Sequence, residues 1–232
     1  MGIILAILLF SAIIIIHELG HFLLAKANGI RVDEFSLGLG PTLFGKQFGE
    51  TKFSVKLLPF GGACMMGEDD VEDISEGSFN SKSVWARMSV IVAGPLFNLI
   101  LAWILCMIMI AWVGYRTPVV GGVIDGYSAQ EQGLSEGDVI TKIGGRSVHI
   151  WNDISLYNLT HSEEKEVEIT YKRDGKTHTA VLEPRQKEGD TAPLLGVTGG
   201  KMERPGFFGT LKYGAYTVKY WIDYTVASLR ML

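Results

Sequence analysis

The hydropathy pattern of the 232-residue chain is dominated by two long apolar runs. Residues 2–25 contain one carboxylate and no cation, and residues 88–115 contain no formal charge. A helix that crosses the hydrocarbon core of a bilayer needs ~20 mainly apolar residues. The two runs therefore predict transmembrane helices, which we place at 1–27 and 87–115.

The segment between the predicted helices, 28–86, has a different pattern. Glycines divide it into short apolar pieces, and Phe53, Val55 and Leu57 alternate with polar neighbours. Such alternation is typical of a strand with one buried face. We therefore expect a β-rich, membrane-associated loop region here.

The sequence after the second helix is typical of a small water-soluble unit. Residues 117–185 alternate short strand and helix patterns and include a hairpin turn at Asp174-Gly175. A linker that contains Gly and Pro is expected over 186–206. Apolar residues then recur every three or four positions over 207–232, which predicts an amphipathic helix that lies on a membrane surface or packs on another helix.

The distribution of basic residues predicts how the chain is oriented in the membrane. Lys and Arg residues gather at Lys26 and in 28–87, whereas the N-terminal end of the first helix has none. Because basic residues favour the cytoplasmic side, we expect 28–86 inside, and residue 1 and 117–185 outside. The first helix lacks the basic start of a signal peptide, so we expect it to be retained.

Charge and cysteine content narrow the possible functions. The net charge of −4 is spread along the chain, which does not favour a nucleic-acid partner. The two cysteines are Cys64 and Cys106. Because Cys106 lies in an apolar run and neither cysteine has the spacing of a zinc ligand, we expect two free thiols.

Three ionisable residues interrupt the first apolar run: His17, Glu18 and His21 form the pattern H-E-x-x-H. Residues at i and i+4 lie on one face of a helix, so the two imidazoles can bind one zinc ion. Zinc lowers the pKa of a bound water to ~7, and Glu18 can take the proton of that water. The alternative is a polar cluster satisfied within the protein, but ionisable residues inside a membrane are costly and mark functional sites.

These motifs together resemble the site-2 protease family of intramembrane zinc metalloproteases. Three blocks carry the resemblance: HELGHFLLAKANGIRVDEFSLGLGP, LLPFGGACMMGE and FNSKSVWARMSVIVAGPLFNLILA. The chain looks most like bacterial members of the sigma-E-regulator protease type, from residue 1 to about 230. The resemblance implies an α-helical, multi-pass protein of the bacterial cytoplasmic membrane.

The resemblance also implies roles for residues outside the H-E-x-x-H motif. Gly94, Pro95 and Asn98 form a Gly-Pro-x-x-Asn element that lies near the active centre in this family, and we expect these three residues to bind the substrate. The alternative is a kinked helix whose Asn98 bonds to a neighbouring helix. Gly61 and Gly62 belong to the block that resembles the family's membrane-associated β-loop, which we expect to pair with the substrate.

A second resemblance concerns the water-soluble unit. The stretch GLSEGDVITKIGG, from Gly133 to Gly145, resembles the core signature of PDZ domains. Residues 117–185 are therefore expected to form an extracytoplasmic α+β PDZ domain that binds an extended peptide or acts as a size filter. By the same resemblance, the peptide groove would include Val120, Gly121, Gly122 and Val123.

One feature of the family is absent from the sequence. Its third metal ligand is an Asp in an Asn-Pro…Leu-Asp-Gly block on a later transmembrane helix, and no such block occurs here. Two protein ligands leave a zinc site incomplete. The sequence thus resembles a C-terminally incomplete member, and it leaves open a truncated chain, an incomplete gene product, or a ligand from another chain.

The sequence as a whole predicts an intramembrane zinc metalloprotease that hydrolyses peptide bonds of transmembrane substrates. His17 and His21 bind Zn²⁺ and Glu18 activates water. By resemblance, the substrates are single-span membrane proteins such as anti-sigma factors or leftover signal peptides. The alternative is a non-catalytic, membrane-anchored PDZ module or an inactive fragment.

Overall fold

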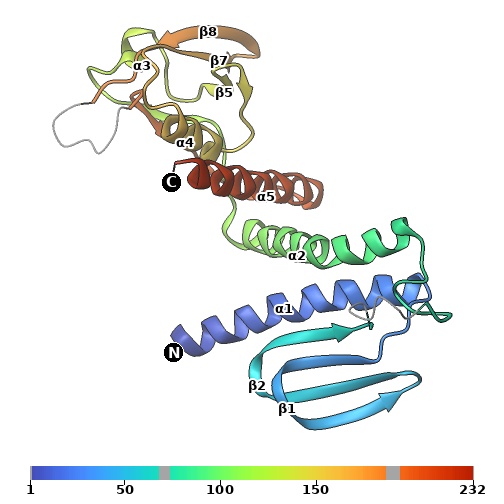
Figure 1. Ribbon diagram of the computed structural model, residues 1–232. Helices are drawn as coiled ribbons and strands as arrows, with labels where there is room; N and C mark the ends of the chain where they lie inside the picture. The colour runs from blue at the N-terminus through green and yellow to red at the C-terminus, as the bar shows by residue number, and fades with distance from the viewer. Residues whose placement is uncertain (1, 68–73, 187–193, 232) are drawn as a thin grey trace. The chain divides into compact units, whose positions relative to one another are not determined.

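The computed structural model describes residues 2–67, 74–186 and 194–231 (Figure 1). The chain divides into two compact units, Met1–Ala102 and Trp103–Leu232. The first unit contains helix α1, strands β1 and β2 and most of helix α2. The second contains the end of α2 and all later elements.

Helices α1 (Gly2–Ala27) and α2 (Val84–Val113) are both long and apolar enough to cross a membrane. At a rise of about 1.5 Å per residue, α1 is roughly 39 Å long. Large apolar side chains are exposed along both helices, among them Ile3, Leu8, Phe10, Leu105 and Trp112. Contact with lipid accounts for these exposed side chains, because water would be an unfavourable surrounding for so large an apolar surface.

Helix α1 ends through a glycine-dependent motif. Gly29 has a φ of 63°, in the left-handed region. The N–H of Ile30 donates to the carbonyl of Ala25 at 2.9 Å, and the N–H of Gly29 donates to the carbonyl of Lys26 at 3.1 Å. This pair of bonds is the Schellman motif, which satisfies carbonyls that the helix end would otherwise leave unpaired.

Helix α2 begins and ends slightly earlier than the predicted range 87–115. The Ser83 hydroxyl accepts a hydrogen bond from the N–H of Ala86 at 3.3 Å, so Ser83 caps the start of the helix. At the other end Gly114 has a φ of 92°, which turns the chain out of the helix.

The two helices of the first unit approach each other closely at Gly20. A β-carbon at position 20 would lie 2.6 Å from the carbonyl oxygen of Ala93. Small residues permit such close backbone approach between membrane helices. Nearer the end of α1, the Asn28 amide donates to the Ser89 hydroxyl at 3.1 Å.

Strands β1 (Glu34–Phe48) and β2 (Thr51–Met65) form a sheet beside α1 (Figure 1). Both strands bend, so that residues 34–37 register with 52–55 on one side and with 62–65 on the other. The segment 62–65 therefore lies next to 34–37 in this sheet.

An aromatic cluster holds this sheet to α1. Phe22 of α1 lies 5.3 Å from Phe35 and 5.6 Å from Phe53, measured between ring centroids. These distances are typical of favourable tilted and edge-to-face aromatic pairs. On the same helix, the Ser11 hydroxyl donates to the carbonyl of Pro59 at 2.5 Å and so ties β2 to α1 at a second point.

The second unit is built around a four-stranded antiparallel sheet of order β6-β5-β7-β8, with two further strand pairs, β4-β9 and β3-β10. Its core is formed by apolar residues of these strands and of α4. The elements are β3 (Tyr115–Arg116), β4 (Val120–Val123), α3 (Ser128–Glu131), β5 (Val139–Ile143), β6 (Arg146–Ser147), α4 (Trp151–Thr160), β7 (Val167–Arg173), β8 (Lys176–Leu182), β9 (Val197–Gly199), β10 (Met202–Glu203) and α5 (Phe207–Arg230).

The range 186–206, which the sequence presents as a linker, differs from that expectation. It contributes β9 and β10, which pair with β4 and β3. Because these strands have only three and two residues, they carry no alternating pattern that a sequence reading could detect. Residues 187–193 of this range lie outside the described part.

Helix α5 packs against the rest of the second unit through aromatic side chains. Tyr213 stacks on Tyr115 and Tyr216 stacks on His149, with ring centroids 3.9 and 3.8 Å apart. Trp103 donates its indole N–H to the carbonyl of Leu211 at 3.1 Å. Other apolar side chains of α5 stay exposed, including Phe207, Phe208, Trp221 and Leu229. The helix thus packs on a neighbour with one face and keeps a second apolar surface.

Candidate metal centre

The two histidines of the H-E-x-x-H motif lie side by side on α1. Their ring centroids are 4.8 Å apart and the ring planes are inclined by 78°. One helical turn separates His17 from His21, so both rings face the same side of the helix. That side is the one that packs against α2.

Gly94 of α2 occupies the point on which both rings converge. A β-carbon at position 94 would lie 2.5 Å from Nε2 of His21 and 2.6 Å from Nε2 of His17. Any side chain here would collide with both nitrogens. The glycine therefore lets both imidazole rings pack directly against the backbone of α2, with both Nε2 atoms facing the same point.

The other nitrogen of each ring faces a polar group of α2. Nδ1 of His21 lies 2.7 Å from the carbonyl oxygen of Val90. Since a carbonyl can only accept, Nδ1 of His21 carries the proton and Nε2 has a free lone pair. Nδ1 of His17 lies 3.2 Å from the side-chain amide of Asn98. Val90, Gly94 and Asn98 are four residues apart and so form one face of α2.

Glu18 lies where β2 approaches α1. A β-carbon at Gly62 would lie 3.3 Å from Cγ of Glu18 and 3.6 Å from Cγ2 of Ile14. Gly61 has a φ of 89°, a conformation that favours glycine. Gly62 therefore lets the backbone of β2 lie close to the side chain of Glu18.

The remaining predicted site residues are placed differently. Pro95 is exposed. Within residues 2–67, 74–186 and 194–231, no three His, Cys, Asp or Glu residues lie together as a group that could hold a metal ion, so the histidine pair stands as two candidate ligands. Sequence reasoning missed the contact of His21 with the carbonyl of Val90, because a backbone acceptor has no signature in the side-chain pattern.

The four residues predicted to line a peptide groove lie in β4, which forms a two-stranded sheet with β9. Val120 is fully buried, and both its N–H and its carbonyl bond to backbone groups of Gly137 and Asp138 at 2.8 Å. Gly122 and Val123 pair with β9, whereas Gly121 is exposed. In the described part of the chain β9 pairs with β4 alone, and the Trp151 indole of α4 covers Gly199 at its end.

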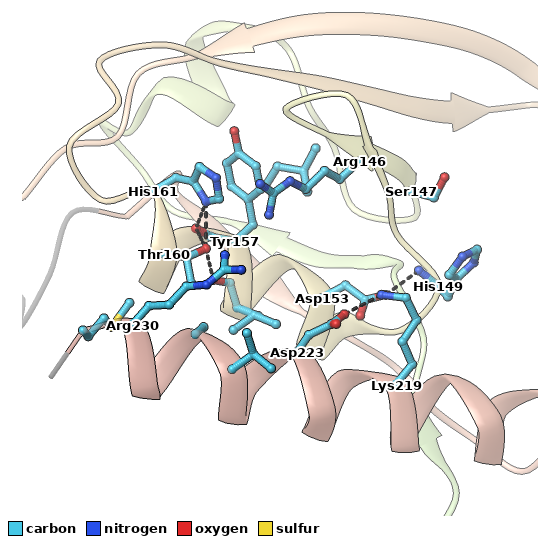
Figure 2. Close-up of a pocket in the computed structure, with 15 residues that line it drawn as sticks. Arg146, Ser147, His149, Asp153, Tyr157, Thr160, His161, Lys219, Asp223 and Arg230 are labelled. Carbon is cyan, nitrogen blue, oxygen red and sulfur yellow. Dashed lines mark hydrogen bonds and ion pairs between the residues drawn. The ribbon is translucent and has the colours of Figure 1, made fainter. Parts of the chain in front are cut away.

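The second unit also contains a pocket of about 750 Å³ between α4 and α5 (Figure 2). Its polar groups are largely engaged with one another: Asp153 accepts from the N–H of His149 at 2.7 Å, and Lys219 pairs with Asp223. Burial and a hydrogen bond to Glu164 raise the pKa of Tyr157 to about 12. None of the predicted site residues lines this pocket, so it is separate from the histidine pair.

The donor set at Gly94 fits a zinc ion. Neutral imidazole nitrogens are common zinc ligands, with Zn–N distances of about 2.0–2.1 Å. A histidine that binds metal donates its other N–H to a carbonyl or similar acceptor, as His21 does to Val90. The convergence of both Nε2 atoms on Gly94 is consistent with an ion held between the two rings.

Comparison with known proteins gives a consistent result. A protein of Clostridium acetobutylicum whose name assigns it to the zinc metalloproteases is 36% identical over 231 residues, covering 100% of this chain and 68% of its own length. A similarly named protein of Clostridium perfringens is 38% identical, covering 92% of this chain and 63% of its own length. The regulator of sigma-W protease RasP of Bacillus subtilis is 28% identical, covering 97% and 72%.

A solved structure matches part of the second unit. The PDZ domain of an SdrC-like protein from Listeria monocytogenes is 28% identical, with a TM-score of 0.30, over 38% of this chain and 90% of that domain.

Residues 5–232 match the family described as peptidase family M50. That match and the names of the relatives confirm the predicted resemblance to site-2 zinc metalloproteases and the predicted metalloprotease class. The chain therefore belongs to peptidase family M50, the site-2 protease family.

Proposed function

We propose that this chain supplies the zinc-binding and water-activating part of an intramembrane endopeptidase. The observation that carries the proposal is that the Nε2 atoms of both histidines converge at Gly94. The carboxylate of Glu18 directly follows His17 in the sequence, and all three residues lie in an apolar helix. His17 and His21 hold the metal and Glu18 acts as the base. A polar cluster that binds no metal would not need two imidazole nitrogens directed at the same point of α2.

The chemistry divides between the metal and the chain. Zinc, when bound, polarises a substrate carbonyl and lowers the pKa of water. Glu18 accepts the proton of the attacking water and passes it to the leaving amine. The apolar surroundings on α1 and α2 keep other water away, which strengthens each charge interaction in the site.

The substrate is proposed to enter as an extended strand beside β2. Backbone carbonyls of a transmembrane helix are bonded within the helix, so attack requires local unwinding. The segment 62–65 has residues 34–37 on one side, and its other edge can accept an added strand. Because Gly62 lies against Glu18, a strand paired there has its carbonyls next to the base.

The substrate class and orientation follow from the sequence and from the relatives' names. We propose single-span membrane proteins, either anti-sigma factors, in line with a relative named as a regulator of sigma-W protease, or leftover signal peptides. The bacterial cytoplasmic membrane is the proposed location, with 28–86 on the cytoplasmic side and 117–185 outside. Residues 117–185 are proposed as the PDZ domain that controls access.

A third protein ligand completes the proposed site. Catalytic zinc sites use three protein ligands and an open position, and His17 and His21 provide two. The relatives extend beyond the part that this chain matches. We propose that an acidic residue outside the described part, in the same or another chain, provides the third.

One observation favours a second function, a non-catalytic peptide-binding module. Strand β9 has an unpaired edge within the described part, and α4 lies beside it through Trp151. An extended peptide can add to such an edge. Peptide binding with no turnover under any condition would favour this function over the protease.

Cleavage of a reconstituted substrate tests the proposal. The chain and a single-span substrate are placed in the same lipid vesicles with zinc, and fragments are followed by mass spectrometry. We expect cleavage that Glu18→Gln abolishes without loss of bound zinc, whereas Glu136→Gln, in an exposed loop, leaves it unchanged. Equal activity of the chain and Glu18→Gln would refute the assigned base.

A further inference from the structure

We propose that Asn98 is a positioning residue for His17: its amide oxygen accepts the Nδ1–H of the imidazole and keeps the lone pair on Nε2. The inference rests on the proposed zinc site and assigns a task to one more side chain. It differs from the sequence prediction, in which Asn98 contacts the substrate.

The first support is the matching arrangement around Gly94. His21 already donates its Nδ1–H to α2, to the carbonyl of Val90 at 2.7 Å. Asn98, two turns further along α2, stands 3.2 Å from Nδ1 of His17. Each ring therefore has one partner on the same face of α2, and Gly94 lies between the two partners.

The second support concerns the proton of His17. Both Nε2 atoms lie within 2.6 Å of the position that a β-carbon of Gly94 would take, so they face the same part of α2. A metal held between the two rings needs a lone pair on each Nε2, so His17 must then carry its proton on Nδ1. A proton on Nδ1 needs an acceptor, and the amide oxygen is the part of Asn98 that can accept.

The third support is an unmet hydrogen bond. Oδ1 of Asn98 is buried and has no partner within the described residues, while the amide nitrogen faces His17. A 180° flip of the side-chain amide exchanges its oxygen and nitrogen with little change in shape. In either orientation one amide atom lacks a partner, so internal hydrogen bonding alone does not explain an asparagine here. Its one polar contact is with a metal-binding residue, as expected for a positioning role.

The state of His17 can be measured without zinc or substrate. The chain is labelled with ¹⁵N-histidine in lipid nanodiscs, and the His17 signals are assigned by substitution. We expect the metal-free chain to carry the His17 proton on Nδ1. Asn98→Leu, similar in size but with no acceptor, should shift the population toward the form protonated on Nε2. Asn98→Asp, which keeps an acceptor, should preserve the Nδ1–H form.

Metal affinity provides a second readout. Removing an outer partner of a ligating histidine typically weakens metal binding about 10- to 100-fold. We expect a loss of that size in zinc competition with Asn98→Leu, near-complete rescue with Asn98→Asp, and no change with Leu99→Ala on the exposed side of α2.

Two outcomes would overturn the inference: a His17 proton on Nε2 in the unsubstituted chain, or Asn98→Leu with unchanged tautomer and zinc affinity. If Asn98→Leu fails to fold, a loss of the Nδ1–H form in Asn98→Asp contradicts the inference as well. A chain with the Nδ1–H form that cleaves no substrate would count against the proposed function and support this inference.

Discussion

At the scale of single residues, the metal centre depends on two glycines, which have no side chain. Gly94 leaves space where two imidazole nitrogens converge, and Gly20 lets α1 and α2 approach closely enough for that convergence. Neither glycine has a positive φ, so both are required by space rather than by backbone conformation.

The space at Gly94 gives a direct prediction. In Gly94→Ala the new methyl group lies within 2.6 Å of both Nε2 atoms, so one ring must move away. We expect zinc affinity to fall by at least the roughly 100-fold cost of losing ligand geometry, measured by competition with a chromogenic chelator. The matched control is Gly2→Ala, where a methyl group meets nothing within 4 Å. Unchanged affinity in Gly94→Ala would show that the metal does not bind between these rings.

The sequence predicted some of these residues and missed others for identifiable reasons. The pair His17 and His21 follows from helical spacing, which fixes the face of each ring. The contact between Asn98 and His17 could not be predicted, because it depends on the rotation of α2 against α1. Resemblance assigned Asn98 to substrate binding, and the structure places its amide 3.2 Å from Nδ1 of His17.

At the scale of secondary-structure elements, β2 brings the proposed substrate edge to the carboxylate. The strand is fixed to α1 by the Ser11–Pro59 hydrogen bond at 2.5 Å and passes over Glu18 at Gly62. A sequence reading detects the strand from its alternation. It does not detect the bend that brings 62–65 beside 34–37, which depends on pairing between distant residues.

The close passage at Gly62 predicts a specific defect. A β-carbon there would lie 3.1 Å from the carbonyl of Ser36 and 3.3 Å from Glu18. Gly62→Val should therefore push the strand away and reduce cleavage of a membrane substrate about 100-fold, as expected when a reacting group is displaced by ~1 Å. Zinc affinity should stay within a factor of two or so, since no metal ligand moves. If zinc binding and cleavage fall together, the strand supports the metal site rather than the substrate.

Short strands were the main difference between the predicted and observed elements. Strand β9 has three residues and lies in the range expected to be a linker. It pairs with β4, the strand that holds the residues that resemblance had assigned to a peptide groove. Of these, Val120 is buried and Gly121 is exposed, and their role in peptide binding stays a prediction.

At the scale of the whole molecule, each unit has a core of its own. The first is organised by Phe22, Phe35 and Phe53, and the second by the sheet around Ile140 and Ile169. The stability of the second unit should therefore be separable from the metal chemistry of the first.

A buried ion pair makes this separation measurable. The side chain of Asp138 is 1% exposed, and Arg173 bonds to both its oxygens at 2.7 Å. Burial raises the pKa of Asp138, but the hydrogen bonds from Arg173 and Ser135 outweigh it and leave the pKa below its usual value. The pair thus stabilises the fold above the unfolded pKa of about 3.9, and this contribution is lost as the pH falls through the lower folded value.

Removing the arginine should destabilise the second unit alone. Arg173→Met leaves a buried carboxylate unpaired and should cost about 3 kcal/mol, the low end for a broken buried pair, because the guanidinium is 38% exposed. Hydrogen exchange of the β5 and β7 amides at pH 7 measures the loss. Arg146→Met, exposed and without an acidic partner in the described part, is the control. Zinc affinity should not change, and a parallel loss would mean that the units are coupled.

The central claim is that His17 and His21 together bind zinc, and X-ray absorption at the zinc edge tests it most directly. In the reconstituted chain we predict one bound zinc with two imidazole nitrogens at about 2.0–2.1 Å, and no bound zinc in the His17→Ala, His21→Ala double variant. A chain that binds no zinc, or a double variant that keeps the same coordination, would contradict the account.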